Sequence, residues 1–309
     1  MREFLMLAKT YAKQKVDDWY MSEKMDGMRA WWDGGVSKGR DTRTIPWANN
    51  IKSSSTATGL WSRYGKVIHA PYEWLSTLPP IPLDGELWMG RGSFQETMSV
   101  CRQHVPDSRW RRVKYKVFDS PSYDTVFTSG VINNPNFKAT IKLDACLDAV
   151  GRVSHQARPF VQVIEMFASL SWPENCEPVA QYKASDWSVV NEYLEVVLSL
   201  QGEGVILRHP GSYWCPARSD LLLKVKPYLD SEGIVVGWEL GKGKYEGMLG
   251  ALTIKWKEKQ FALSGFTDYE RDLKNLCFTM GEIITFRYRE LTESGIPKEA
   301  RFLRKAVIA

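Results

Sequence analysis

The chain has 309 residues, a net charge of +5 and 44% hydrophobic residues, which favours two globular domains. No apolar run reaches transmembrane length, and the beginning of the chain lacks the pattern of a secretory signal, so we expect a soluble, cytoplasmic protein. Five cysteines are scattered without a CxxC pair, which excludes a disulfide framework or a zinc site in favour of free thiols.

The first predicted elements are two strands within residues 19–33, on either side of a turn at Asp26 and Gly27. This turn belongs to the hexapeptide KMDGMR, residues 24–29. A lysine amine attacks phosphorus only when unprotonated, which burial or nearby positive charge favours. Glycine allows a tight turn and the close approach of a phosphate. Lys24 is therefore a candidate nucleophile, although a KxDGxR sequence in isolation indicates only a surface lysine.

A basic segment covers approximately residues 35–59, and its positive charge continues to Lys66. From Gly35 to Lys66 six basic residues stand against one acid, with Trp47 and Trp61 among them. A basic, aromatic segment suits the backbone of a nucleic acid, while the alternative is a solvated loop with two buried tryptophans. The candidate nucleic-acid-binding residues of this segment are Lys38, Arg40, Arg43 and Lys52.

Two further strands carry candidate site residues. In LDGELW, Asp84 and Glu86 are two apart and share one face of a strand. Acids on an apolar strand are costly unless they bind something such as a metal or a ribose hydroxyl; a solvated hairpin is the alternative. In RVKYKVF, alternate residues form one apolar face, and Phe118 ends the strand before a chain reversal. An aromatic ring there can cover a purine base or join the core.

The next predicted elements are helices over about 137–150 and 185–200, followed by the strands GVILR and LLLKVK. Glu203 lies between two glycines at the start of the first of these strands and is a candidate metal ligand. Magnesium suits carboxylate and phosphate oxygens. Lys224 and Lys226 are two apart in an apolar run, where they make poor core residues but could hold an α-phosphate.

The remainder of the chain is rich in strands. From Gly233 onward, short strands alternate with glycines around one short helix, for which Thr267 is the predicted N-cap and Glu270 completes a capping box. This pattern fits a small β-barrel of the OB type. We expect an α+β protein with domains at 1–229 and 230–309. The sequence GKGKYEG, residues 241–247, is interpreted as a loop between strands.

The order of KMDGMR, LDGELW, KVFDSP, GEGVILR and LLLKVK resembles that of the covalent nucleotidyltransferases, specifically the minimal bacterial and viral ATP-dependent DNA ligases. The resemblance covers nearly the whole chain and includes SRYG, residues 62–65, and GRGSFQ, residues 90–95. It implies a nucleotidyltransferase (adenylation) domain followed by an OB domain. It also implies a monomeric enzyme of DNA repair or replication, without a membrane partner. The enzyme would seal 5′-phosphate/3′-hydroxyl nicks in double-stranded DNA through a lysyl-AMP intermediate, with ATP and Mg²⁺ as cofactors.

The resemblance also implies a role for individual residues. Lys24 is the lysine that becomes adenylylated, Phe118 stacks on adenine, and Arg63 of SRYG contacts the nucleotide and the 5′-phosphate of the nick. The metal ligands are Glu86 and Glu203. The other residues that contact ATP or AMP are Glu23, Arg29, Glu86, Lys224 and Lys226. In PKEARFLRKA, either Arg301 or Arg304 orients pyrophosphate. Compared with minimal ligases, residues 35–59 look like an insertion, which we expect to grip the duplex beside the nick.

Two other kinds of protein share part of this equipment. An RNA ligase or a GTP-dependent mRNA capping guanylyltransferase would also carry KxDG and an OB domain. A non-catalytic OB-fold nucleic-acid-binding protein would use the basic segment and would not need Lys24. The SRYG and GRGSFQ sequences favour a DNA ligase.

Overall fold

The computed structural model describes residues 5–45, 47–49, 55–123, 125–126, 156–275, 277–292 and 294–306. The chain divides into two compact units, Met1–Val225 and Lys226–Ala309. The sequence placed the domain boundary at Asp230, so Lys226 falls in the second unit rather than the first. The helix predicted over 137–150 lies outside the described residues, as do Lys52 and Cys146.

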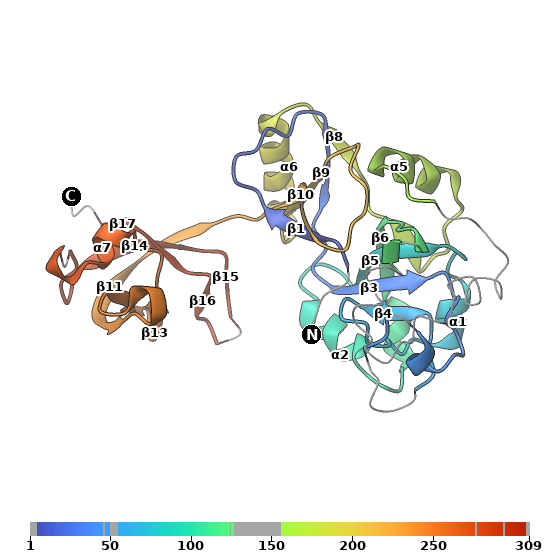
Figure 1. Ribbon diagram of the computed structural model, residues 1–309, viewed down its shortest axis with the longest axis horizontal. Coiled ribbons are helices and arrows are strands. Elements are labelled where there is room, and N and C mark those ends of the chain that lie inside the picture. Colours follow the sequence, from blue (N-terminus) through green and yellow to red (C-terminus); the bar gives the residue numbers. More distant parts are fainter. Residues whose placement is uncertain are drawn as a thin grey trace. The chain divides into compact units, whose positions relative to one another are not determined.

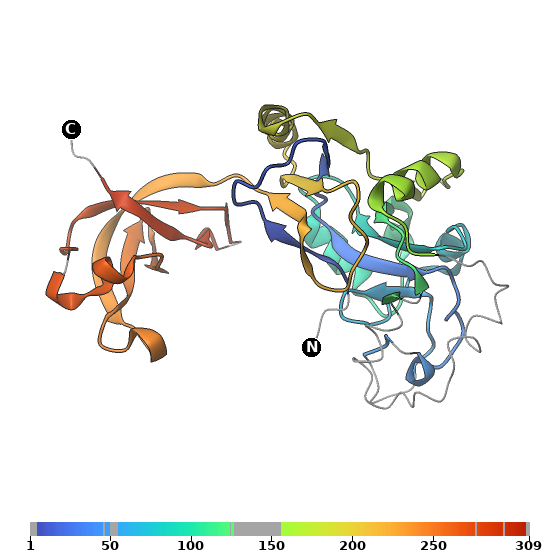
Figure 2. The same cartoon turned by 45° about the horizontal axis from the view of Figure 1, so that its top comes forward.

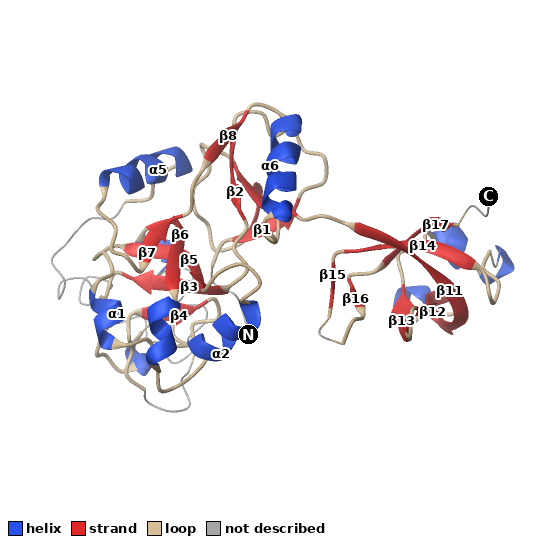
Figure 3. Ribbon diagram, turned by 180° about the vertical axis from the view of Figure 1, so that it is seen from behind, coloured by secondary structure: helices blue, strands red, loops and turns tan. Residues whose placement is uncertain are grey.

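The first sheet of the first unit has the strand order β1-β10-β9-β2-β8. Its strands are β1 (Leu7–Thr10), β2 (Trp19–Glu23), β8 (Tyr182–Ala184), β9 (Val205–Arg208) and β10 (Arg218–Val225). Helix α6 (Trp187–Ser199) lies against this sheet (Figures 1 and 3). Its side chains Val190, Leu194 and Val197 are buried at the predicted helical spacing, and the Asp186 carboxylate caps its first turn.

The second sheet of the first unit has the order β4-β3-β5-β6-β7. Its strands are β3 (Met28–Asp33), β4 (Leu60–Ser62), β5 (Pro82–Trp88), β6 (Lys114–Asp119) and β7 (Cys176–Pro178). Helices α1 (Tyr72–Ser76), α2 (Phe94–Cys101) and α5 (Phe160–Ser169) contribute to its hydrophobic core. The predicted alternation in β6 is confirmed, because Val113, Tyr115 and Val117 are all fully buried.

The two predicted strands around Lys24 belong to different sheets. Strand β2 pairs with β8 and β9, while β3 pairs with β4 and β5. Both strands exist as predicted, but the turn between them is a crossing from one sheet to the other (Figure 2). The KMDGMR sequence therefore lies where the two sheets of the first unit meet.

The described part of the basic segment packs into a hydrophobic cluster that it shares with other parts of the first unit. Val36, Ile45 and Trp47 are buried there with Trp31 and Trp61. The rings of Trp31 and Trp47 meet edge to face, with their centroids 4.7 Å apart. Trp47 and Trp61 are therefore core residues. The alternative in which both tryptophans are buried is confirmed, and neither ring is exposed for stacking on a base.

The second unit is a five-stranded antiparallel sheet of order β13-β12-β11-β14-β17. Its strands are β11 (Leu229–Leu240), β12 (Leu249–Trp256), β13 (Lys259–Leu263), β14 (Ile283–Tyr288) and β17 (Arg301–Lys305), with a small hairpin of β15 (Glu290–Leu291) and β16 (Pro297–Lys298). Helix α7 (Asp268–Arg271) begins with the predicted capping box of Thr267 and Glu270. The 241–247 sequence connects β11 to β12, as expected.

Two general expectations can be compared with the described residues. Cys101, Cys176, Cys215 and Cys277 are free thiols, as predicted for these four. Among the described helices, none has the length and apolar character needed to cross a membrane.

Candidate active site

Lys24 and Glu203 meet at the end of the first sheet. The backbone N–H of Lys24 donates to the carbonyl of Gly204 at 2.8 Å, which aligns the end of β2 with the start of β9. The Lys24 ammonium forms an ion pair with the Glu203 carboxylate, and the two side chains are only 24% and 14% exposed. The structure thus brings together the predicted nucleophile and a predicted metal ligand that are 179 residues apart in the sequence.

Gly27 allows the KMDGMR loop to pack directly on strand β5. A Cβ atom at this position would collide with the carbonyl oxygen of Leu87 and lie 2.9 Å from the Cγ of Glu86. Glycine is required here because of this close approach, rather than because of an unusual backbone conformation. The contact places the loop that carries Lys24 beside Glu86.

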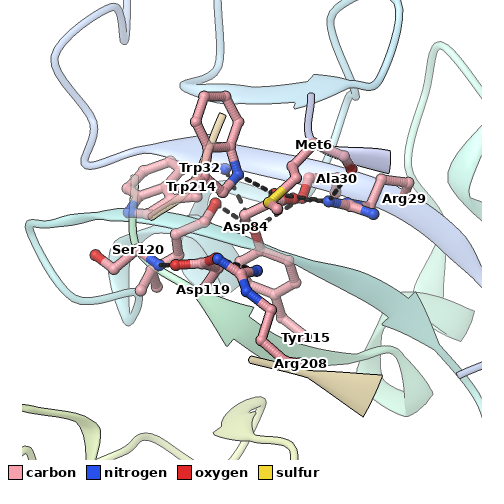
Figure 4. A network of polar contacts seen from close by, with 11 residues as sticks. Met6, Arg29, Ala30, Trp32, Asp84, Tyr115, Asp119, Ser120, Arg208 and Trp214 are labelled. Atoms are coloured by element: carbon pink, nitrogen blue, oxygen red, sulfur yellow. Dashed lines mark hydrogen bonds and ion pairs between the residues drawn. The ribbon is translucent and has the colours of Figure 1, made fainter. Parts of the chain in front are cut away.

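Arg29 is held by the carboxylate of Asp84, not by that of Glu86, which lies opposite it on the neighbouring strand. Arg29 and Glu86 are partners in the β3–β5 ladder, yet the guanidinium bonds both oxygens of Asp84, at 2.6 and 2.7 Å (Figure 4). Asp84 is fully buried, and the indole of Trp214 also donates to it at 2.8 Å. Asp84 is therefore an internal counter-charge that fixes Arg29, and Glu86 is left for other partners.

Glu86 has the electrostatic character of a ligand site. The pKa of Glu86 is raised to about 7, chiefly by burial; Arg29 and Lys24 act against this rise, and the carboxylates of Glu203 and Asp84 add to it. Two acids that penalise each other's charge fit a divalent cation. Within the described ranges no group of three or more acid, histidine or cysteine side chains could hold a metal. Phosphate and water oxygens would therefore have to complete a magnesium shell around Glu86 and Glu203.

Phe118 lies on the partly open face of β6, opposite the buried Val117. The Arg29 guanidinium is positioned over its ring, 4.5 Å from the centroid. Phe118 is therefore brought next to Arg29, and it is not one of the fully buried core residues of this sheet.

A buried ion pair that the sequence analysis did not assign joins the two sheets. Nη1 of Arg208, at the end of β9, lies 2.7 Å from Oδ2 of Asp119, at the end of β6, and the side chains are 5% and 2% exposed (Figure 4). Burial raises the pKa of Asp119, and Arg208 acts in the opposite direction. Asp119 lies within the KVFDSP motif and Arg208 ends the GEGVILR motif, so their position in these motifs was the available signal.

The remaining predicted nucleotide-binding residues are placed less closely together. Glu23 forms a bidentate ion pair with Arg91, at 2.7 and 2.8 Å, and Arg91 comes from the GRGSFQ sequence. Lys224 is half-buried on β10, paired with Ile206 of β9 in the sheet that also carries Lys24. Lys226 begins the second unit, and Arg301 and Arg304 are exposed on β17 of that unit.

The predicted DNA-binding residues occupy varied environments. Lys38 lies over the ring of Tyr72 at 4.1 Å, and Arg43 is paired with its neighbour Asp41. Arg40 is partly exposed, and Lys52 is not among the described residues. Arg63 is exposed, stacks on Tyr64, and lines a cavity of about 840 Å³ together with Arg29 and Glu86.

Comparisons with known proteins give a consistent family. Residues 240–305 match the model of the DNA ligase OB-like domain. A DNA ligase of Haemophilus influenzae is 30% identical over 302 residues, covering 97% of this chain and 91% of that protein. A solved structure of a Lig E DNA ligase is 28% identical with a TM-score of 0.66, covering 99% of this chain and 100% of that one. Another structure, Pmar-Lig_Pre, has a TM-score of 0.65 at 18% identity and covers 98% of this chain and 67% of that one, which shows the fold.

The fold is therefore a nucleotidyltransferase domain followed by an OB-like domain, and the site gathers a lysine, acids and an aromatic ring at the junction of the two sheets of the first domain. With a full-length relative of this identity, the chain belongs to the ATP-dependent DNA ligases.

Proposed function

We propose that this ligase seals nicks with a 5′-phosphate and a 3′-hydroxyl in double-stranded DNA, as a monomer, with Lys24 as the adenylylated residue and Mg²⁺ as the metal. The observation that carries the proposal is the ion pair of Lys24 with Glu203 at the junction of the sheets, next to Glu86. A single chain contains both the nucleotidyltransferase and the OB-like unit, so one molecule has the parts for the whole reaction.

The reaction consists of three displacements at phosphorus. Lys24 Nζ, after losing a proton, attacks the α-phosphorus of ATP; an N–P bond forms and pyrophosphate leaves. An oxygen of the nick 5′-phosphate then attacks the adenylyl phosphorus, and the lysine nitrogen leaves and regains a proton. Finally the 3′-hydroxyl, losing its proton, attacks the 5′-phosphorus, and AMP leaves. Because the reacting groups are similar in each step, the same cationic surroundings can serve all three.

The residues around Lys24 have distinct roles in this proposal. Glu203 holds the amine in place before ATP binds, since the two groups are already ion-paired. Phe118 presents its ring to the adenine. Lys224 and Lys226 hold the α-phosphate, Glu23 supports the nucleotide from the end of β2, and Arg63 binds the 5′-phosphate. Arg301 or Arg304 orients the pyrophosphate.

Glu86 and Glu203 are the residues that would hold Mg²⁺. Burial is the main cause of the raised pKa of Glu86 and the charge of Glu203 adds to it, so a bound cation would offset both penalties. When bound, Mg²⁺ would neutralise part of the negative charge on the triphosphate. This accounts for two acids near Lys24 when the phosphates themselves are negative.

Substrate choice tests the proposal. Purified protein should seal a 5′-phosphorylated nick in DNA when supplied with ATP and Mg²⁺, and should seal a nick in an RNA duplex much more slowly. GTP should not replace ATP. Protein labelled by GTP, a preference for RNA, or binding to DNA without sealing would contradict it, and would support the capping enzyme, the RNA ligase or the non-catalytic binding protein respectively.

A further inference from the structure

The lining of the 840 Å³ cavity carries basic side chains that the proposed roles do not use. Besides Arg29 and Arg63, its lining includes Lys66, His69, Arg102 and His104. Glu86 is the only acid among the described residues that line it, whereas four lysine or arginine side chains line it. The cavity is thus an environment for an anion with several negative groups.

Two of these cations have no counter-charge of their own. Within the described part of the chain, neither Lys66 nor Arg102 takes part in an ion pair, and both side chains are exposed. In the same unit, arginines such as Arg109 and Arg112 are each matched to a carboxylate, Asp107 and Glu96. Lys66 and Arg102 therefore remain available for a ligand.

His69 and His104 come from different parts of the chain, and their rings are neighbours in the lining of the cavity. Their ring centroids are 5.2 Å apart, with His69 following β4 and His104 following α2. Burial lowers the pKa of His69, and the nearby charge of His104 lowers it further. An anion beside the pair would remove their mutual repulsion and accept hydrogen bonds from ring N–H groups.

The position of the cavity limits what the anion can be. The lining continues from the histidines to Gly27 and Glu86, and Glu86 experiences the charge of Lys24. In the proposed reaction, the group that must reach the adenylylated lysine from outside is the 5′-end of a DNA strand. The phosphates that follow this end in the strand need cations, because phosphate contacts supply most of the non-specific affinity for DNA.

We propose that Lys66, His69, Arg102 and His104 form a binding site for the phosphodiester backbone of the strand that carries the 5′-phosphate. The site rests on the proposed function, since it receives the strand that accepts AMP. It would hold this strand while Arg63 binds the terminal phosphate, and it would contribute affinity without reading the base sequence.

Two assays on the full-length protein separate this site from the adenylylation chemistry. The variant Arg102→Ala/His104→Ala should become adenylylated by ATP at a rate close to that of wild type. Its kcat/KM for sealing a pre-adenylylated DNA nick should fall about tenfold, as expected for the loss of contacts with the strand. Arg111→Ala is the matched control, because it removes an exposed arginine outside this cavity, and it should leave both rates unchanged.

Neutral methylphosphonates, placed one at a time in the nicked substrate, show which backbone phosphate the site binds. Wild type should lose sealing efficiency at one or two positions in the 5′-phosphorylated strand, and the double variant should show no additional loss at those positions. Equal losses in both proteins, coupling only in the template strand, or a defect confined to adenylylation, as for a pyrophosphate site, would overturn the inference. A wild-type protein that neither adenylylates nor seals would instead refute the proposed function.

Discussion

At the scale of single residues, buried charges around the site are matched in pairs. Asp84 holds Arg29, and Asp119 holds Arg208, with Asp84 and Asp119 adjacent in the β5–β6 ladder. A buried charge without its partner is strongly destabilising, so each pair fixes the position of an arginine. Arg29, fixed in this way, is presented to the ring of Phe118.

Replacing Asp84 should show how much of the stability depends on its ion pair with Arg29. Asp84→Ala leaves both Arg29 and the Trp214 indole without their acceptor, and should lower the free energy of unfolding by about 3–5 kcal/mol. Asp84→Asn keeps an oxygen for Trp214 and should cost less. Urea denaturation of the three proteins measures the difference. An alanine variant as stable as wild type would show that the pair does not hold the fold.

Phe118 should affect nucleotide binding rather than stability. Phe118→Leu removes an aromatic surface, and loss of base stacking of about 1–3 kcal/mol should raise the KM for ATP in the adenylylation assay by about tenfold. Phe160→Leu is the control, because this buried ring should change stability without changing that KM. If both variants have the wild-type KM, Phe118 does not contact adenine.

The position of a candidate site residue could be predicted from the sequence where a local pattern carried it. The alternation of β6 distinguishes Phe118 from the core, and the motifs KMDGMR, LDGELW and GEGVILR point to Lys24, Glu86 and Glu203 as candidates. Residue pairing could not be predicted in the same way. Trp214 reaches Asp84 across 130 residues, and which carboxylate takes Arg29 depends on how β3 and β5 pack rather than on spacing.

At the scale of elements, Asp33 connects β3 to the basic segment that follows it. One carboxylate oxygen accepts from the backbone of Gly35 and the other from the indole of Trp61, both at 2.9 Å, while the hydroxyl of Tyr123 donates to the Asp33 carbonyl. Asp33 is fully buried. Asp33 therefore anchors the start of the basic segment, in addition to the packing of the tryptophans. The basic composition of the segment did not predict this contact.

The stability that depends on Asp33 should vary with pH. Burial raises the pKa of Asp33 from 3.8 to about 6. Between these values the folded state binds more protons than the unfolded state, so this contribution is complete below about pH 4 and decreases as pH rises to about 6. Relative to Asp33→Asn, wild type should lose up to about 3 kcal/mol across this window. Urea denaturation at several pH values measures this; parallel curves for the two proteins would contradict it.

At the scale of the whole molecule, each unit has its own hydrophobic core. The second unit packs Phe286 with Trp256, Phe261 and Tyr288, while the first unit has separate clusters on its two sheets. The strands of the second unit and its capping box could be predicted, because their signals are local. The division of β2 and β3 between two sheets could not be predicted. A turn within one sheet and a connection between two sheets have the same local sequence pattern.

Independent cores predict independent unfolding. Phe286→Ala removes a fully buried ring and should destabilise the second unit by about 3–5 kcal/mol. Hydrogen exchange should then accelerate in the described residues after Lys226 and stay unchanged in the β-sheets of the first unit. Acceleration throughout both units would mean that they unfold as one.

The most direct test of the account is the intact mass of the protein after incubation with ATP and Mg²⁺. Wild type should gain the mass of one adenylyl group, lose it again when nicked DNA is added, and release sealed DNA. Lys24→Ala should gain nothing, although it should retain the wild-type fold because Lys24 is partly exposed. An adduct that forms equally without Lys24, or a wild-type protein that never carries one, would contradict the mechanism.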